Sequence, residues 1–548
     1  MKGSMMDPLI NRLKQRYATM LGERAQWESH WSEIERRVSP RGDVLRRPAV
    51  GGRRTEYIFE STATLGLERF AAAMQGLVAP QGQRWHMLAT TDRRLMADIQ
   101  VQRYLEEVND LLFDFRYSAT SGFSTNLFEC MIQLGSLGTA PMYIEDQPAS
   151  GISYRAMHIT ECCIDVDHQG RVDTVGREFD WTARQAMQKW GIEALPRAVR
   201  DAMDNPDRKF TFCQMIAPRA DYDPTRMDAK GKRWGSWYWL KDSGDAIIAE
   251  GGFNTMPIPV ARYTTAPREN YGRSPAMMVL PDIKMINEMA KTVIRSAHRN
   301  LDPPLLTADD GVLTRIQTRP GAINIGGLNS RGDQMVRPLQ TGGSLPEAME
   351  LQAQTRQTIK DAFFVSLFQS LVDAPDRMTA TEVLERMRER GVLLAPAAGR
   401  IETELLEPLI TRELDIHARA GRLPPMPEAL ARAGGEVKVI YQNPMSRAAK
   451  AEEASGFFQL VNAITPLAAS EPEILDALDM PAAVRGIASI IGVPARWMRS
   501  IDEAKARNDA RTQAAQVQQL AAAAPQVAGA TLDLARAEQL GGGLEGAL

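Results

Sequence analysis

The feature that most constrains this chain is a pair of helical segments on either side of a stretch rich in glycine and proline. Over residues 281 to 300 six polar or charged side chains fall within about a third of the helix circumference, and apolar residues occupy the opposite side; the six are Lys284, Glu288, Lys291, Arg295, His298 and Arg299. Pro303 and Pro304 end this helix, and residues 301 to 343 contain only short β-like runs. Pro346 opens a second helix that reaches the apolar run FFVSLF. The pattern predicts two rods of about 30 Å joined by a loop-rich insertion.

The rest of the chain alternates between helical and β-rich texture. Apolar residues recur with helical spacing from Asp7 to Pro40 and over about 60 to 78, 93 to 117 and 120 to 136. From about 138 to 265 the texture is β-rich, in the runs APMYIED, ISYRAMHI, CCIDVD, RVDTVGREFDW, FTFCQMIA and WGSWYWLKD. The fold class is therefore α+β and mainly helical.

The part after the second long helix is also predicted to be mostly helical. Residues 370 to 378 break the pattern, and Thr379 with Glu382 has the spacing of a capping box. A helix is expected over about 398 to 420 with a kink at Pro408, followed by the strand-like run KVIYQNP at 438 to 444. The Ala-rich end is expected either to pack against copies of itself or to fray.

Composition restricts the class of protein. With 548 residues the chain should form three or four modules, and no apolar run is long enough for a membrane span. The charged start is unlike a secretory signal, and the four cysteines show no C-x-x-C spacing, so we expect free thiols in a reducing cytoplasm. The net charge of -3 favours neither tight nucleic-acid binding nor membrane binding.

Motifs for catalysis were not found in the sequence. A phosphate-binding loop, a dinucleotide fingerprint, an H-E-x-x-H motif and a G-x-S-x-G motif are all missing, so we expect neither a motor nor a cofactor. A rival interpretation is a metal-dependent DNA-processing enzyme that uses scattered carboxylates, which would be Asp165, Asp167 and Asp173.

Three local patterns have a structural and a functional interpretation. A cluster resembling a zinc site is better read as strand residues, because adjacent cysteines in a strand point to opposite faces; its members are His158, Cys162, Cys163 and His168. Asp167 to Gly170 is expected to be a hairpin turn, since Gly176 stands where a calcium loop needs its closing glutamate. The arginines between Arg36 and Arg54 indicate an exposed basic loop or an anion contact.

Three stretches, in this order, are similar to a known family. They are YIFESTATLGLERFAAAMQGLVAPQGQRWHML at 57 to 88; YGRSPAMMVLPDIKMINEMAKT at 271 to 292 with DPPLLTADDGVL and RPGAINIGG; and DAFFVSLFQSLVDAPDRMTATEVLERMRERGVLLAPAAGRIETELLEPLITREL at 361 to 414. The chain resembles the portal proteins of short-tailed, podovirus-type bacteriophages, called head-to-tail connecting proteins. The resemblance extends over about residues 10 to 505.

The resemblance implies a portal fold with parts in a set order. These are a wing at 1 to 280, a first stem helix at 281 to 300, a clip at 301 to 343, a second stem helix at 344 to 369, a tunnel loop at 370 to 380, wing and channel helices at 381 to 444, and a crown with its Ala-rich helical extension at 445 to 548. The pattern of helix, insertion, helix and break agrees with this order.

The resemblance also implies a function and a set of partners. About twelve copies would form a ring at one capsid vertex, assembled in the host bacterial cytoplasm and retained in the virion. Double-stranded DNA would be packaged through its channel by a separate terminase, and later ejected. Further implied partners are a tail adaptor, the capsid protein and internal core or scaffold proteins, with no membrane. A non-conducting scaffold or tail adaptor remains an alternative.

Two sets of basic residues are candidates for contacts in such a ring. The DNA-channel candidates are Lys284, Lys291, Arg295, Arg299 and Arg377. The stem candidates would equally serve as a solvated helix side or pair with a neighbouring subunit. Within the insertion, the candidates for contact with the terminase and the adaptor are Arg315, Arg319, Arg331 and Arg337. A polar surface of this kind fits exchangeable partners better than a permanent apolar interface.

Overall fold

The computed structural model forms two compact units. The first comprises Met1–Trp85, Leu112–Leu423 and Tyr441–Ala448, and the second comprises His86–Leu111, Pro424–Ile440 and Ala449–Leu548. The residues that the structure describes are 8–40, 55–92, 94–147, 151–242, 246–301, 305–307, 323, 328, 331–338, 345–366, 393–435, 437–442, 456–466, 479–491, 493, 497–499 and 503–518.

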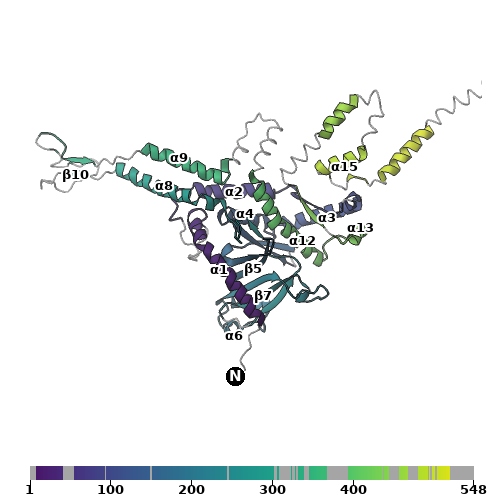
Figure 1. Ribbon diagram of the computed structural model, residues 1–548, viewed down its shortest axis with the longest axis horizontal. Helices are drawn as coiled ribbons and strands as arrows, with labels where there is room; N and C mark the ends of the chain where they lie inside the picture. The colour runs from purple at the N-terminus through teal and green to yellow at the C-terminus, as the bar shows by residue number, and fades with distance from the viewer. Residues whose placement is uncertain are drawn as a thin grey trace, which may run out of the picture. The chain divides into compact units, whose positions relative to one another are not determined.

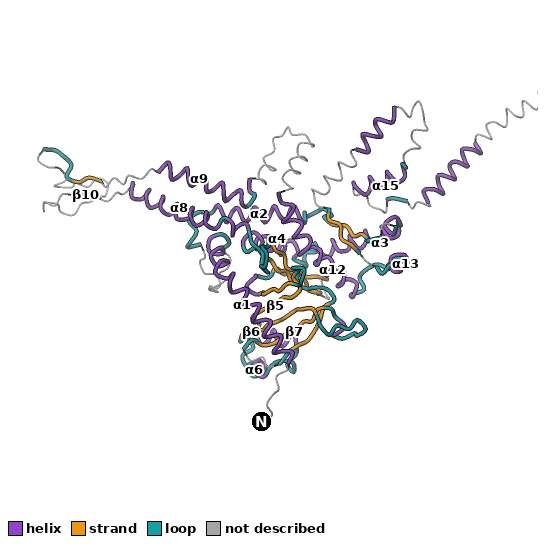
Figure 2. Tube along the Cα trace, viewed as in Figure 1, coloured by secondary structure: helices purple, strands orange, loops and turns teal. Residues whose placement is uncertain are grey.

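Two antiparallel sheets lie at the centre of the first unit, as Figure 2 shows. The three-stranded sheet has the order β3-β2-β9, with β2 at Thr139–Gln147, β3 at Gly151–Ala156 and β9 at Val260–Arg262. The five-stranded sheet runs in chain order and consists of β4 (Cys162–Val166), β5 (Val172–Thr182), β6 (Lys209–Pro218), β7 (Trp234–Leu240) and β8 (Ala249–Phe253). These strands confirm the β-rich texture predicted over 138 to 265.

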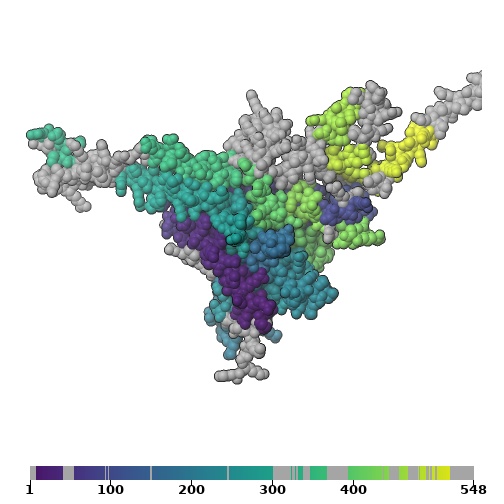
Figure 3. Space-filling model, viewed as in Figure 1, coloured from purple at the N-terminus to yellow at the C-terminus, as the bar shows by residue number. Residues whose placement is uncertain are grey.

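The first helix, α1 (Pro8–Arg37), packs on one face of the five-stranded sheet. Figure 3 shows it in purple at the surface of the first unit. Its buried residues follow the predicted helical period, and the Tyr17 ring packs edge-on against Trp239 with 5.6 Å between centroids. Cys163 belongs to this core, whereas Cys162 points to the other face, as alternation along a strand requires. All four cysteines are free and buried, and burial raises the pKa of Cys162 to about 12.

The opposite face of the five-stranded sheet holds a second core around α5 (Ala183–Trp190). A capping box between Thr182 and Gln185 starts this helix. The backbone N–H groups of these two residues each donate to the other's side chain, so neither is left without a hydrogen bond. The short helix α6 (Arg197–Arg200) follows, and Val199 is fully buried. The predicted turn after β4 is confirmed, because the Gly170 N–H donates to the Asp167 carbonyl at 3.0 Å.

Helices α2 (Thr62–Val78) and α4 (Phe123–Ser136) pack on each other beside the three-stranded sheet. Two glycines lie in close contact, one directly before β2 and one shortly before α7 (Pro275–Met278). Gly138 has φ of 77°, and a Cβ added there would lie 2.3 Å from the Gly272 carbonyl oxygen. A larger side chain at Gly138 would therefore displace the segment that leads into the first long helix.

A buried ion pair joins α3 (Ile99–Arg116) to α12 (Glu407–Arg419) within the first unit. Arg116 and Glu413 are both fully buried, and Tyr154 donates its hydroxyl to the same carboxylate. A π-helical turn at Glu402–Leu406 precedes Pro408, at the place where a kink was predicted. Proline has no N–H to donate, so a local change of hydrogen-bond spacing accommodates it.

The second unit contains a two-stranded sheet of β1 (His86–Ala89) and β12 (Lys438–Tyr441), which confirms the strand expected at 438 to 444. The 3-10 turn η1 (Leu95–Ala97) stands where the third helix was expected to begin, and that helix starts only at Ile99. Further helical segments are α13 (Glu428–Arg432), residues 456–466, α15 (Met480–Ile491) and residues 503–518.

Several predicted features lie outside the described residues. These are the basic loop beyond residue 40, the break at 370 to 378, the capping box at Thr379 and the chain after residue 518. In the part of the chain that the structure describes, no helix combines the length and the apolar character needed to cross a membrane.

Candidate functional site: the paired helices

The two long helices are present and lie side by side in the first unit (Figure 1). Helix α8 spans Leu280–Leu301 and α9 spans Leu345–Ala362, which gives rods of about 33 Å and 27 Å. Between them the chain forms the antiparallel strands β10 (Leu305–Thr307) and β11 (Val336–Pro338). The predicted arrangement of helix, insertion and helix is confirmed.

Each helix buries one side toward its neighbours. Ile283 and Ile286 on α8 are at most 1% exposed, and Ile359 on α9 is fully buried. Beyond the end of α9, Phe363 fits against Gly66 of α2, where an added Cβ would come within 3.2 Å of its ring. Close packing at this point fastens the pair to α2, while the outer part of α8 stays exposed.

Helix α9 is interrupted at the start of the apolar run FFVSLF. It stops at Ala362, and Phe364 follows with φ of 56°, a conformation that a non-glycine residue adopts only when its surroundings hold it. Phe363 and Val365 on either side are buried. Phe363 and Val365, in the first part of the run, therefore pack into the core of the first unit. Residues 367 to 369 lie outside the described residues, so the end predicted at residue 369 stays a prediction.

A hydrogen-bonded network attaches α8 and α9 to the loop before α2. We call the part of the pair that contains Asn287 and Arg356 its base. The Asn287 side chain on α8 accepts hydrogen bonds from the backbone N–H groups of Phe59 and Glu60, at 2.9 and 3.2 Å. Glu60 in turn accepts two bonds from Arg356 on α9, at 3.1 and 2.7 Å. One loop residue thus connects both helices. Burial opposes ionisation of Glu60, but the bonds from Arg356 and Thr62 outweigh it and lower its pKa.

Two of the channel candidates also belong to this base. Lys284 forms an ion pair with Glu33 of α1, and the hydrogen bond from Lys284 lowers the pKa of Glu33. Lys291 lies 3.5 Å from Glu288 and places its ammonium 5.6 Å from the centre of the Phe59 ring. Both lysines have partners inside their own chain, so their charges are already compensated.

The outer half of α8, which we define as Arg295 to Leu301, differs from the base in its ion pairing. Arg295 and Arg299 are exposed and form no ion pair with any residue that the structure describes. His298, one residue before Arg299, is also exposed. The predicted charged face therefore divides into a paired base and an outer half with two guanidinium groups facing solvent. Arg377, the remaining channel candidate, lies outside the described residues.

The candidates in the insertion are described only in part. Arg331 is exposed, and the backbone of Arg337 pairs with Leu306 between β11 and β10. Arg315 and Arg319 lie outside the described residues. Ile323 and Leu328 are exposed apolar residues of the same insertion, at 88% and 63%.

The carboxylates of the enzyme interpretation have structural partners. Asp165 forms an ion pair with Arg16 at 3.0 Å, and Asp173 accepts a hydrogen bond from Thr174. Asp167 caps its turn, where the Arg171 N–H is the main reason for its lowered pKa. Across the described ranges no three His, Cys, Asp or Glu side chains gather as they would around a metal ion.

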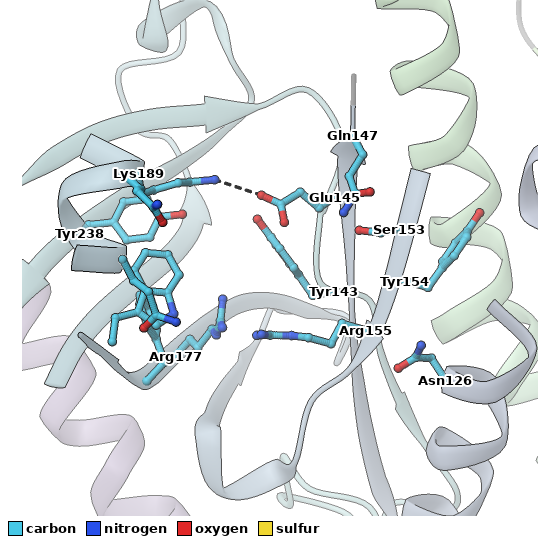
Figure 4. Close-up of a pocket in the computed structure, with 14 residues that line it drawn as sticks. Asn126, Tyr143, Glu145, Gln147, Ser153, Tyr154, Arg155, Arg177, Lys189 and Tyr238 are labelled. Carbon is cyan, nitrogen blue, oxygen red and sulfur yellow. Dashed lines mark hydrogen bonds and ion pairs between the residues drawn. The ribbon is translucent and has the colours of Figure 1, made fainter. Parts of the chain in front are cut away.

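A polar pocket between the two sheets was not anticipated from the sequence. It has a volume of about 580 Å³ and contains Arg155 of β3 and Arg177 of β5 (Figure 4). Both arginines lie in strands that alternate with ordinary β period, so nothing in the local sequence distinguishes them. Only the pairing of distant strands brings them together.

Comparison with known proteins gives agreeing results at the level of sequence. The family model described as bacteriophage head to tail connecting protein matches residues 11–498. The probable portal protein of Bordetella phage BPP-1 is 26% identical over 488 residues, which is 88% of this chain and 87% of that protein. The portal protein of Salmonella phage epsilon15 is 27% identical over 542 residues and covers 95% of each chain.

A solved structure was also matched. It is the neck of an empty GTA particle computed with C6 symmetry, with a TM-score of 0.38, 15% identity, and coverage of 82% of this chain and 98% of that one.

Proposed function

The chain belongs to the bacteriophage head to tail connecting protein family and is a head–tail connector, and from this premise we propose that copies of it form a DNA-conducting portal ring. About twelve subunits would surround an axial channel at one capsid vertex. Double-stranded DNA would enter through the channel, driven by a separate terminase, and leave through it into the tail.

The observation that supports this proposal most directly is the division of α8. Its base is held by pairs within the chain, whereas Arg295 and Arg299 are exposed on the outer half. A helix built in this way can stand in a channel wall without losing its attachment to the subunit. Its two guanidinium groups would face the duplex and keep it centred.

The charge balance suits a sliding duplex. Each phosphate that a protein neutralises releases counterions and makes binding tighter at low salt. A channel lined by many unpaired cations would therefore hold DNA too firmly for transport. With Lys284 paired to Glu33 and Lys291 to Glu288, the described part of α8 would offer few unpaired cations to the duplex, and the net charge of the chain is only -3.

We assign the remaining parts of the chain on the same premise. Residues 1 to 280 would form the wing, α8 and α9 the stem, 301 to 343 the clip, 370 to 380 the tunnel loop, and 445 to 548 the crown with its extension. The clip would bind the terminase first and the tail adaptor afterwards, through Arg315, Arg319, Arg331 and Arg337. The wing and crown would meet the capsid protein and internal scaffold proteins.

The test is the double variant Arg295→Gln/Arg299→Gln. Electron microscopy of the purified variant should still show rings, because neither arginine pairs with a described residue of its own chain. DNA packaging into capsids containing the variant should change in rate and lose part of its salt dependence, since two phosphate contacts per subunit are removed.

A matched control removes the same charge elsewhere. Arg184 and Arg200 are exposed on α5 and α6, away from the paired helices, and Arg184→Gln/Arg200→Gln should leave packaging unchanged. If the α8 variant packages DNA like the control at every salt concentration, the outer half of α8 does not face the duplex. If the purified chain never forms rings with a central hole, the portal proposal itself is wrong.

A further inference from the structure

The pocket between the sheets has the character of a binding site. Its walls come from both sheets and from α5, with Tyr143 and Glu145 of β2 facing Phe179 and Trp181 of β5. Figure 4 shows Arg155 and Arg177 extending toward one another across it. A cavity of about 580 Å³ is large enough for a side chain or a small molecule.

Arg177 is a buried cation that forms no direct ion pair with a described residue, although Glu161 lies near enough to act on its charge. Its residue is 5% exposed, its Nε atom has no hydrogen-bond partner, and it forms no ion pair with any residue in the described ranges. The guanidinium group instead lies over the rings of Phe179 and Tyr143, at 4.4 and 5.6 Å from their centres. Burial, followed by the charge of Arg155, lowers its pKa. An unpaired buried charge of this kind is costly to the folded state.

The other buried arginines among the described residues show which contact Arg177 lacks. Each has a carboxylate partner, in the pairs Arg116–Glu413, Arg219–Glu250, Arg262–Glu404 and Arg412–Asp415. Arg177 departs from this rule and faces a second arginine, Arg155, which is exposed and likewise unpaired among the described residues. Two guanidinium groups that converge on a cavity are complementary to an oxyanion placed between them.

The surroundings favour a single carboxylate over a polyanion. The third cation of the pocket, Lys189, is already paired with Glu145 at 3.0 Å. An adjoining cavity that shares Arg155 and Arg177 is also lined by Glu161, Glu178 and Asp180, which would repel the neighbouring phosphates of a nucleic acid. The rings of Phe179 and Trp181 supply an apolar wall beside the charges.

We propose that this pocket binds a carboxylate presented by a protein segment, with Arg155 and Arg177 as the two arms that hold it. The planar fork of arginine matches a carboxylate through parallel hydrogen bonds, and binding would supply the direct ion pair that Arg177 lacks. The carboxylate could be a glutamate or aspartate side chain or a chain terminus. The site is independent of the stem and of the channel proposed above.

The test is calorimetric titration of the full chain with acetyl-Phe-Glu-Phe-amide and with its Gln counterpart. The Glu peptide should bind at least tenfold more tightly than the Gln peptide, because a charge-assisted bond between ions contributes about 1.5 to 3 kcal/mol. N-acetyl-phenylalanine tests a chain terminus as the source. Inorganic phosphate and a thymidine octamer test the phosphate alternatives.

Variants assign the effect to the pocket. Arg155→Gln should weaken the Glu peptide about tenfold and leave the Gln peptide unchanged, and it should fold because Arg155 is exposed. Arg200→Gln removes the same charge outside the pocket and should bind normally. Arg177→Lys keeps the charge but loses the fork, and should also weaken binding. Each of four results would overturn the proposal. They are equal binding of the two peptides, no binding of any carboxylate probe, no effect of Arg155→Gln on binding, and tighter binding of the octamer than of the Glu peptide.

Discussion

Removing the charge of Glu413 should destabilise the first unit more than any exposed acidic substitution. Glu413 receives a hydrogen bond from Arg116 Nε at 2.9 Å and a second from the same guanidinium, and both side chains are fully buried. In Glu413→Gln the amide keeps the shape but removes the carboxylate that neutralises the buried charge of Arg116. The rings of Trp85 and Phe113, 4.8 and 5.0 Å from the guanidinium, offset only part of that loss.

The magnitude follows from the burial of the pair. Breaking a buried ion pair by removing one partner costs about 3 to 5 kcal/mol, whereas an exposed pair contributes about 0 to 1 kcal/mol. With a urea m-value of about 3 kcal/mol/M, the unfolding midpoint of Glu413→Gln should fall by about 1 to 1.7 M. Asp201→Asn, which breaks the exposed Arg197–Asp201 pair, should shift it by at most about 0.3 M.

Urea unfolding followed by far-UV circular dichroism, at one protein concentration for all variants, measures these shifts. The double variant Arg116→Met/Glu413→Leu supplies the decisive comparison, because it removes both charges and fills a similar volume. It should recover more than half of the loss, since the cost in Glu413→Gln comes from the unpaired charge. If Glu413→Gln unfolds like Asp201→Asn, or if the double variant is the less stable of the two, the reasoning from buried charge is refuted.

Three smaller predictions follow from single contacts. Gly138→Ala should lower the yield of folded protein, because φ of 77° and the Gly272 carbonyl at 2.3 Å leave no room for a Cβ; a normal melting temperature would contradict this. Cys163 should react with iodoacetamide only after unfolding, since burial raises its pKa; mass spectrometry of the native protein would reveal labelling. The pKa of Glu60 is lowered in the folded protein. Its contribution to the free energy of unfolding is therefore complete above its ordinary pKa near 4.5, and is lost as the pH falls through its pKa in the folded protein. Hydrogen exchange over residues 57 to 62, corrected for intrinsic rate, should therefore rise as pH falls below about 4.5, and Glu60→Gln should remove that rise.

The elements with strong periodicity were predictable because their patterns are local. The period of the first helix identified Leu13, Tyr17 and Met20 as one face, and these residues are buried against the five-stranded sheet. The runs of β4 to β7 alternate or are bounded by turn residues, which gives strands directly. The face of α8 was equally clear, since charged and apolar residues separate around the helix.

Features that depend on partners from distant segments were not predictable. Nothing in the sequence around Lys284 shows that Glu33, on another helix, neutralises it. The interruption of α9 after Ala362 coincides with the packing of Phe363 against Gly66, a residue of α2 that comes far earlier in the chain. Arg177 looks like any basic strand residue until the pairing of β5 places it across from Arg155. In each case tertiary contact, and not local propensity, decides the outcome.

The two halves of α8 also explain why regular spacing overstates the number of cations available to DNA. Lys284, Lys291 and Arg299 lie on one face by helical period, but the first two are held within the subunit. Substituting Lys284 should therefore loosen α1 from α8 and change stability, whereas substituting Arg299 should change only what the ring does with a polyanion. On the proposed channel, the salt dependence of packaging should accordingly respond to Arg299→Gln more than to Lys284→Gln, because Lys284 must first give up its ion pair with Glu33 before it can neutralise a phosphate and release DNA counterions.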